Sequence, residues 1–185
     1  MKIERENITK DIKKLTLMDI DIEDNKDVNK LLTVLEKLTR GDKYYFEFRR
    51  EDDDFLTDEE IIKYRYEIPE FLRSNGKYQI KGFTDERRFD SVGCLPIDGR
   101  IYGRIIKFWK YFYALLFFNP VATLGWEEYV EICDKIKPQE YGLGIIQKNY
   151  ASSVFIKGHD GDNLIFVYGS NYDETLVDEI IEDIT

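Results

Sequence analysis

The chain has 185 residues and a formal net charge of −10, with 27 lysine and arginine residues against 37 aspartate and glutamate residues. This acidity argues against a nucleic-acid-binding protein, because lysine and arginine contacts to phosphates supply most of the affinity for nucleic acids. It disfavours binding to anionic membrane surfaces for the same reason. With 43% apolar and 35% charged residues, the composition is globular. The length favours a single domain over residues 1–185.

Three features predict a cytoplasmic protein. Residues 1–20 carry acidic side chains and lack the apolar segment of a signal peptide. The longest apolar run, Tyr111–Phe118, is far shorter than the roughly 20 residues of a membrane-spanning helix. The two cysteines, Cys94 and Cys133, lie in no metal-ligand spacing and suggest a reducing compartment.

Helical spacing dominates the N-terminal part of the chain. Apolar residues recur at three- and four-residue steps between Ile8 and Met18, which suggests an amphipathic helix. The same spacing predicts a helix over Asp24–Arg40, and Gly41 is well placed to end it. The next segment, Lys43–Arg50, is rich in aromatic residues and lies between a glycine and an acidic run, which predicts a strand.

A further helix is predicted to begin at Thr57. Its hydroxyl can cap the first turn, and Glu60, three residues later, completes a capping box. Pro69–Arg73 predicts a short helical turn that Asn75-Gly76 ends. Lys77–Phe83 follows and predicts a strand.

The window Gly99–Phe118 contains no acidic residue and many aromatic ones. At about 100° per residue, its basic residues fall within about 120° of arc, and apolar residues occupy the rest. As a strand, it would place Lys107 on the same face as Ile105 and Trp109. We therefore predict a central, aromatic-rich helix that Asn119-Pro120 ends. Its basic residues, which could pair with the acidic C-terminal helix, are Arg100, Arg104, Lys107 and Lys110.

The C-terminal part of the chain combines helices with a hairpin. Helical spacing over Trp126–Ile136 predicts a helix that ends at Pro138. Two apolar runs, Ser153–Lys157 and Leu164–Tyr168, flank the turn sequence GHDGDN and predict a β-hairpin. Asp173–Ile184 predicts a last amphipathic helix. This order of elements predicts an α+β fold, a single domain whose mixed or antiparallel sheet packs against several helices.

The only histidine, His159, lies beside Asp160 and near Asp162. The group could be a general base or part of a metal site, but it falls in the predicted hairpin turn, where Asp, Gly and Asn are favoured for backbone reasons. An acidic run near residue 20 is similar to a calcium loop, yet Asp24 and Lys30 replace the glycine and glutamate that such a loop requires. The sequence predicts no catalytic residue, no metal site and no cofactor.

Phe166–Ser170 resembles the strand and Gly-Ser turn of the nucleotidyltransferase fold, and Asp173 and Asp178 follow it. That resemblance implies two carboxylates that bind metal and nucleotide phosphates. The family places a closely spaced Asp-x-Asp pair on a following strand, whereas here a helix is predicted. The alternative is a turn between a strand and a helix, with Asp173 as a carboxylate at the helix N-terminus.

Two acidic blocks and the hairpin turn supply the candidate binding residues. Either they form solvated loops, because like charges repel one another, or they meet a basic groove on a partner and steer its association. The candidate partner-binding residues are Glu51, Asp52, Asp53, Asp54, Asp58, Glu59, Glu60, Asp160 and Asp162.

In size, acidity and lack of an active-site motif, the chain resembles the immunity proteins of bacterial polymorphic and contact-dependent toxin systems. That resemblance implies a cytoplasmic protein that binds a cognate, basic toxin domain, with a nuclease as the natural guess, and blocks its active site. The alternatives are a nucleotidyltransferase-like enzyme that uses the Gly169-Ser170 turn, and a scaffold protein that self-associates through exposed aromatic residues. The oligomeric state stays open.

Overall fold

The computed structural model of the chain describes residues 1–39, 43–49, 57–81, 90–96, 99–109, 114–120, 124–133, 146–158 and 162–184. The strands are β1 Lys2–Asn7, β2 Ile12–Met18, β3 Lys43–Arg49, β4 Lys77–Lys81, β5 Asp90–Pro96, β6 Ala114–Pro120, β7 Ala151–Lys157 and β8 Leu164–Gly169. The helical segments are α1 Asn25–Thr39, α2 Asp58–Ile62, the π-helical turn η2 Lys63–Glu67, α3 Ile68–Asn75, α4 Gly99–Lys107, α5 Trp126–Cys133 and α7 Glu174–Ile184.

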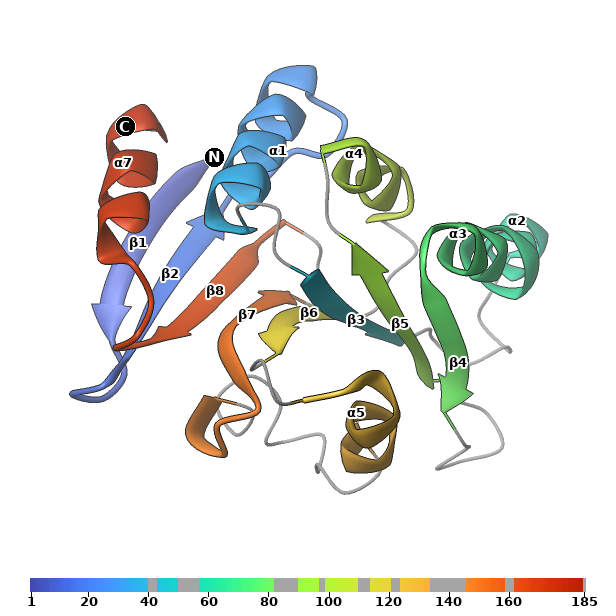
Figure 1. The fold of residues 1–185 in the computed structure, drawn as a ribbon. Coiled ribbons are helices and arrows are strands. Elements are labelled where there is room, and N and C mark those ends of the chain that lie inside the picture. Colours follow the sequence, from blue (N-terminus) through green and yellow to red (C-terminus); the bar gives the residue numbers. More distant parts are fainter. Residues whose placement is uncertain are drawn as a thin grey trace.

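The strands form one sheet in the order β1-β2-β8-β7-β6-β3-β5-β4 (Figure 1). Every strand pair in this sheet is antiparallel. Helices packed on an antiparallel sheet define an α+β fold. The predicted fold class is confirmed.

Helices α1, α4 and α7 lie side by side over one face of the sheet, with α1 in the middle (Figure 1). The first residues of α5 lie against the opposite face, where the Tyr45 hydroxyl donates to the Leu124 carbonyl (2.8 Å) and the Tyr45 ring meets the edge of Trp126. The main core therefore fills the layer between the sheet and the three helices. Its buried members include Leu15, Leu17, Leu31, Leu35, Tyr102, Ile105, Trp109, Phe155, Leu164, Phe166, Tyr168, Leu176 and Val177.

Most of the predicted elements are confirmed where the structure describes them. The helix predicted over Asp24–Arg40 is α1, the aromatic strand is β3, and the last amphipathic helix is α7. The predicted hairpin is β7 and β8, whose register pairs Ser153 with Tyr168 and Lys157 with Leu164. The predicted strand Lys77–Phe83 is confirmed as β4, and the predicted helix Trp126–Ile136 is confirmed as α5. Residues 82–83 and 134–138 lie outside the described residues.

The helix predicted between Ile8 and Met18 is wrong. The chain forms the hairpin β1–β2 instead, closed by hydrogen bonds from the Ile8 and Thr9 amides to the Ile12 carbonyl (3.0 and 3.1 Å). Within β2 the burial alternates, because Leu15 and Leu17 face the helices while the residues between them are only half-buried. The three- and four-residue spacing of the apolar residues was coincidental here. The alternation of apolar and polar residues in Leu15-Thr16-Leu17 was the pattern that indicated a strand.

The long central helix predicted over Gly99–Phe118 is also wrong. Helix α4 ends at Lys107, and β6 begins at Ala114. Arg100, Arg104 and Lys107 of the predicted helical arc belong to α4, and Lys110 lies outside the described residues. Strand β6, which contains most of the apolar run, lies between β3 and β7. A strand with neighbours on both sides reads as a continuous apolar run, which periodicity alone cannot separate from a buried helix. The sequence also missed strand β5.

Two aspartates organise the start of α1. The Asp24 carboxylate accepts a hydrogen bond from the Lys26 amide (2.9 Å), as expected of an N-terminal cap. The Asp27 carboxylate accepts hydrogen bonds from the Asp21 amide (3.1 Å) and from the Met1 amine (3.4 Å). These hydrogen bonds, the first of them above all, hold the pKa of Asp27 below its ordinary value.

We expect Asp27→Asn to lower the free energy of unfolding by about 1 kcal/mol near neutral pH, because a charged hydrogen-bond acceptor is lost at a helix N-terminus. The folded-state pKa of Asp27 is depressed, so its contribution is complete above the unfolded value of about 3.9 and is lost as the pH falls further. Urea unfolding at about pH 7 and about pH 3 measures both effects. The control is Asp11→Asn, because Asp11 is exposed. The prediction would be contradicted if the difference in free energy of unfolding between the wild type and Asp27→Asn were the same at both pH values.

Candidate partner-binding surface

Residues 58–75 form one continuous helical stretch, α2–η2–α3, whose last part, α3, lies against β4 and β5. The predicted capping box is present at its start. The Glu60 amide donates to Thr57 Oγ1 (3.3 Å), and the Thr57 amide donates to Glu60 Oε2 (2.7 Å). At the other end, the Gly76 amide donates to the Leu72 carbonyl (3.0 Å). The short helical turn predicted at Pro69–Arg73 is therefore part of a longer helix.

The middle of the stretch is the π-helical turn η2. There the Ile68 amide donates to the Lys63 carbonyl, five residues earlier. Pro69 follows at once, and in a regular α-helix its ring would clash with the carbonyl of Arg65. A wider turn before the proline relieves that clash. Single π turns within α-helices are frequent at functional sites.

The two sides of this stretch differ in burial. Ile68 and Leu72 are fully buried in the core, and Phe71 is nearly so. On the outside, Ile62 is 50% exposed and Tyr66 is 66% exposed, which makes them the exposed large hydrophobic side chains of the described part of the chain. They lie four residues apart and so about one turn apart on the same side. Two neighbouring exposed apolar side chains on a structured element are typical of a contact surface for another molecule.

Acidic side chains flank this apolar pair. Asp58 and Glu59 are exposed in the first turn of α2, and Asp58 lies one turn before Ile62. Glu67 is exposed after Tyr66, and its carboxylate binds the Lys63 ammonium (2.6 Å). The group Asp58, Glu59, Ile62, Tyr66 and Glu67 is called the α2 surface below.

Of the predicted binding residues, the structure places Asp58 and Glu59 on the α2 surface. Glu60 has a structural role, since its carboxylate accepts the hydrogen bonds of the capping box. Asp162 is exposed in the β7–β8 turn, where its carbonyl accepts a hydrogen bond from the Ile20 amide (2.8 Å). Glu51–Asp54 and Asp160, like His159, lie outside the described residues.

Asp162 and the α2 surface belong to different regions of the fold. Helix α3 lies against β4 and β5, and β5 is three strands from β7 in the sheet. This separation is about 14 Å at ordinary strand spacing. The end of β3 is nearer to Asp162, because Arg49 pairs with Ala114 of β6 and the next residue of β6 pairs with Lys157. Strand β3 thus ends, at Arg49, on the side of the sheet where the β7–β8 turn lies.

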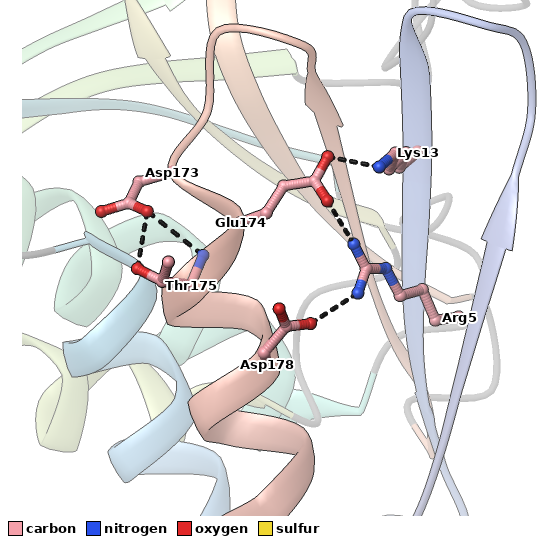
Figure 2. A network of polar contacts seen from close by, with 6 residues as sticks. All are labelled: Arg5, Lys13, Asp173, Glu174, Thr175 and Asp178. Carbon is pink, nitrogen blue, oxygen red and sulfur yellow. Dashed lines mark hydrogen bonds and ion pairs between the residues drawn. The ribbon is translucent and has the colours of Figure 1, made fainter.

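A second polar cluster joins α7 to the first hairpin (Figure 2). The Arg5 guanidinium donates to Glu174 (2.7 Å) and to Asp178 (2.6 Å), and the Lys13 ammonium also donates to Glu174. The hydrogen bond from Lys13 is the main reason that the pKa of Glu174 is lowered. At the start of α7, the Asp173 carboxylate accepts hydrogen bonds from the amide (3.1 Å) and the hydroxyl (2.7 Å) of Thr175.

This cluster bears on the resemblance to nucleotidyltransferases. Asp173 caps α7, and Asp178 binds Arg5, so the carboxylates that the resemblance implied as ligands both have partners within the fold (Figure 2). In the part of the chain that the structure describes, no group of three or more His, Cys, Asp or Glu side chains is placed to hold a metal ion.

The partners of the C-terminal helix differ from those that the sequence suggested. The ion pairs described for α7 go to Arg5, Lys13 and Lys37. The basic helix α4 carries Arg104 and Lys107, but α1 lies between α4 and α7 (Figure 1). The sequence missed the role of Arg5, because nothing local indicates that β1 and α7 lie together.

Comparisons with protein-family models, with curated proteins and with solved structures yield no match to this chain. Its function is therefore argued from its own fold and surface. Among the described residues, no helix is both long and apolar enough to cross a membrane.

Proposed function

We propose that this chain is an immunity protein, a cytoplasmic protein that binds a cognate bacterial toxin domain and blocks its active site. The observation that carries the proposal is the α2 surface, where exposed Ile62 and Tyr66 lie beside Asp58 and Glu59. Tyrosine is among the residues that contribute most to binding at protein interfaces. Acidic neighbours add electrostatic steering toward a basic partner.

The overall charge supports the same partner chemistry. At −10, the chain attracts a cationic protein and repels nucleic acid. Toxin nucleases need cationic clefts to bind phosphates, so they are a natural class of partner. An acidic surface with an aromatic anchor can cover such a cleft.

The test begins with the adjacent upstream gene, which the proposal expects to encode a large secreted protein with a variable C-terminal domain, and measures direct binding to that domain. We expect a one-to-one complex in isothermal titration calorimetry and loss of toxin activity in the complex. Reversing two charges with Asp58→Lys and Glu59→Lys is expected to weaken binding about tenfold and to reduce its dependence on salt.

The chain offers a matched control for this variant. Glu127 and Glu128 are consecutive exposed acids in the first turn of α5, as Asp58 and Glu59 are in α2. Reversal of both to lysine makes the same change in net charge and in helix-end electrostatics. Equal weakening by the two double variants would contradict a specific role for the α2 surface. Sedimentation of the free chain as a stable oligomer that Tyr66→Ala disrupts would support the scaffold alternative instead.

A further inference from the structure

A groove of about 500 Å³ lies between α1 and α7. In Figure 1 these two helices lie at the opposite side of the molecule from α2. This volume is within the range of small-molecule sites in proteins. The groove is lined by Lys26, Asn29, Lys30, Thr33, Val34, Ile180, Asp183 and Ile184.

The groove has an apolar floor. Val34 and Ile180 are each 1% exposed, and Ile184, one turn after Ile180, is half-buried. Lys26, Lys30 and Val34 are four residues apart in turn along α1, and Thr33 is three residues after Lys30. This spacing places all four side chains on one side of the helix. The site therefore combines an apolar base with a polar rim, to which α1 contributes most side chains and α7 contributes Asp183.

The rim carries two lysines for which no ion pair is described. In the described residues, neither Lys26 nor Lys30 forms an ion pair, although the chain as a whole is acidic. Lys37, farther along the same helix, differs because it pairs with Asp183. Two ammonium groups one turn apart that lack an ion-pair partner favour a ligand that brings a negative charge.

The acids near the groove already have partners. Asp183 contributes the carboxylate among the lining residues, and the Lys37 ammonium neutralises it. Asp27 accepts hydrogen bonds from the Asp21 amide and the Met1 amine, and the positive charge of Lys30 contributes to lowering its pKa. Both carboxylates are therefore held by partners other than Lys26 and Lys30.

From this juxtaposition we infer that the groove binds a free monocarboxylate with an apolar tail, such as a medium-chain fatty acid. The carboxylate lies between Lys26 and Lys30, where both ammonium groups donate hydrogen bonds to it. The tail lies along the groove against Ile184, the apolar lining side chain that remains half-exposed. This site is separate from the α2 surface, so the inference does not depend on the proposed function.

The probe is decanoate, titrated into the full chain below its micelle concentration and followed by calorimetry and by NMR of the α1 amides. We expect one saturable site. The neutral analogue decan-1-ol is expected to bind at least several times more weakly, and Lys26→Gln with Lys30→Gln is expected to weaken decanoate binding about tenfold. Thr33→Trp, at an exposed rim position, is expected to block the groove without disturbing the core.

Arg104→Gln with Lys107→Gln is the matched control, because it removes two exposed positive charges from the neighbouring helix α4. Decanoate binding unchanged in this control and weakened in the α1 variant supports the inference. The inference is overturned if the wild-type chain does not bind decanoate, or if both double variants bind it equally. Binding to vesicles of anionic phospholipid without binding to monomeric decanoate also overturns it, because that result assigns the lysines to a membrane surface.

Discussion

Phe166→Ala is expected to lower the free energy of unfolding by about 4 kcal/mol, the largest effect on stability predicted for this chain. Phe166 is fully buried in β8. Its ring lies 4.5 Å from Phe155 and 5.2 Å from Tyr168, measured between centroids, and meets Tyr172 edge-on at 5.1 Å. Alanine would remove these contacts and leave a cavity that the sheet and α7 cannot close.

The control for this prediction is Ile165→Ala, the adjacent residue in the same strand. Ile165 is half-buried and points to the opposite face of the sheet. Its truncation is expected to cost less than about 2 kcal/mol, because less apolar area returns to water. Guanidinium unfolding of both variants measures the difference. Equal losses would mean that the main core does not lie between the sheet and the α1, α4 and α7 layer.

Tyr66→Ala is expected to weaken binding to the proposed toxin partner about thirtyfold or more, as truncation of an aromatic anchor does at protein interfaces. Because Tyr66 is 66% exposed, the free energy of unfolding should change by less than about 0.5 kcal/mol. Calorimetric titration and urea unfolding of the same preparation separate the two effects.

Tyr150 provides the matched control for Tyr66. It is a half-buried tyrosine immediately before β7, away from the α2–η2–α3 stretch. Tyr150→Ala removes the same side chain and should leave partner binding within about twofold of the wild type. A loss of affinity shared by both variants would place the binding surface elsewhere or show a general effect on folding.

The sequence predicted elements whose signals are local. Helix α1 has a complete apolar stripe with a glycine soon after it, and the capping box at Thr57 involves residues three apart. The two strands of the β7–β8 hairpin are separated by a short segment rich in Gly and Asp, which is typical of a turn. Each of these signals acts within one element or one turn, so it can be recognised without tertiary structure.

The errors occurred where the environment of a segment decides its conformation. Ala114–Pro120 becomes a strand because β3 and β7 pair with it on both sides, and no short-range feature of an apolar run reports such neighbours. Ile12–Met18 becomes a strand because β8 pairs with it, although Ile12 and its partner Gly169 are 157 positions apart in the chain. Long-range pairing of this kind overrides weak helical spacing.

The candidate site shows the same division. Asp58 and Glu59 were identified from charge alone, because an acidic run is visible in the sequence. Ile62 and Tyr66 were not identified, because the chain has 13 tyrosines and 12 phenylalanines and the sequence does not distinguish the exposed ones from buried ones such as Tyr44. Their exposure follows from the packing of α3, whose buried residues turn the opposite side of α2 and η2 toward solvent.

The sequence by itself determined the acidity, the α+β class and the positions of the helices and hairpin with strong local signals, since these depend on composition and on neighbouring residues. Tertiary structure alone decided the order of the strands, the pairing of Arg5 with α7, the exposure of Tyr66 and the groove beside Lys26 and Lys30. The reason is physical: burial and charge pairing are properties of residues brought together in space, and here the partners lie up to 173 positions apart in the chain.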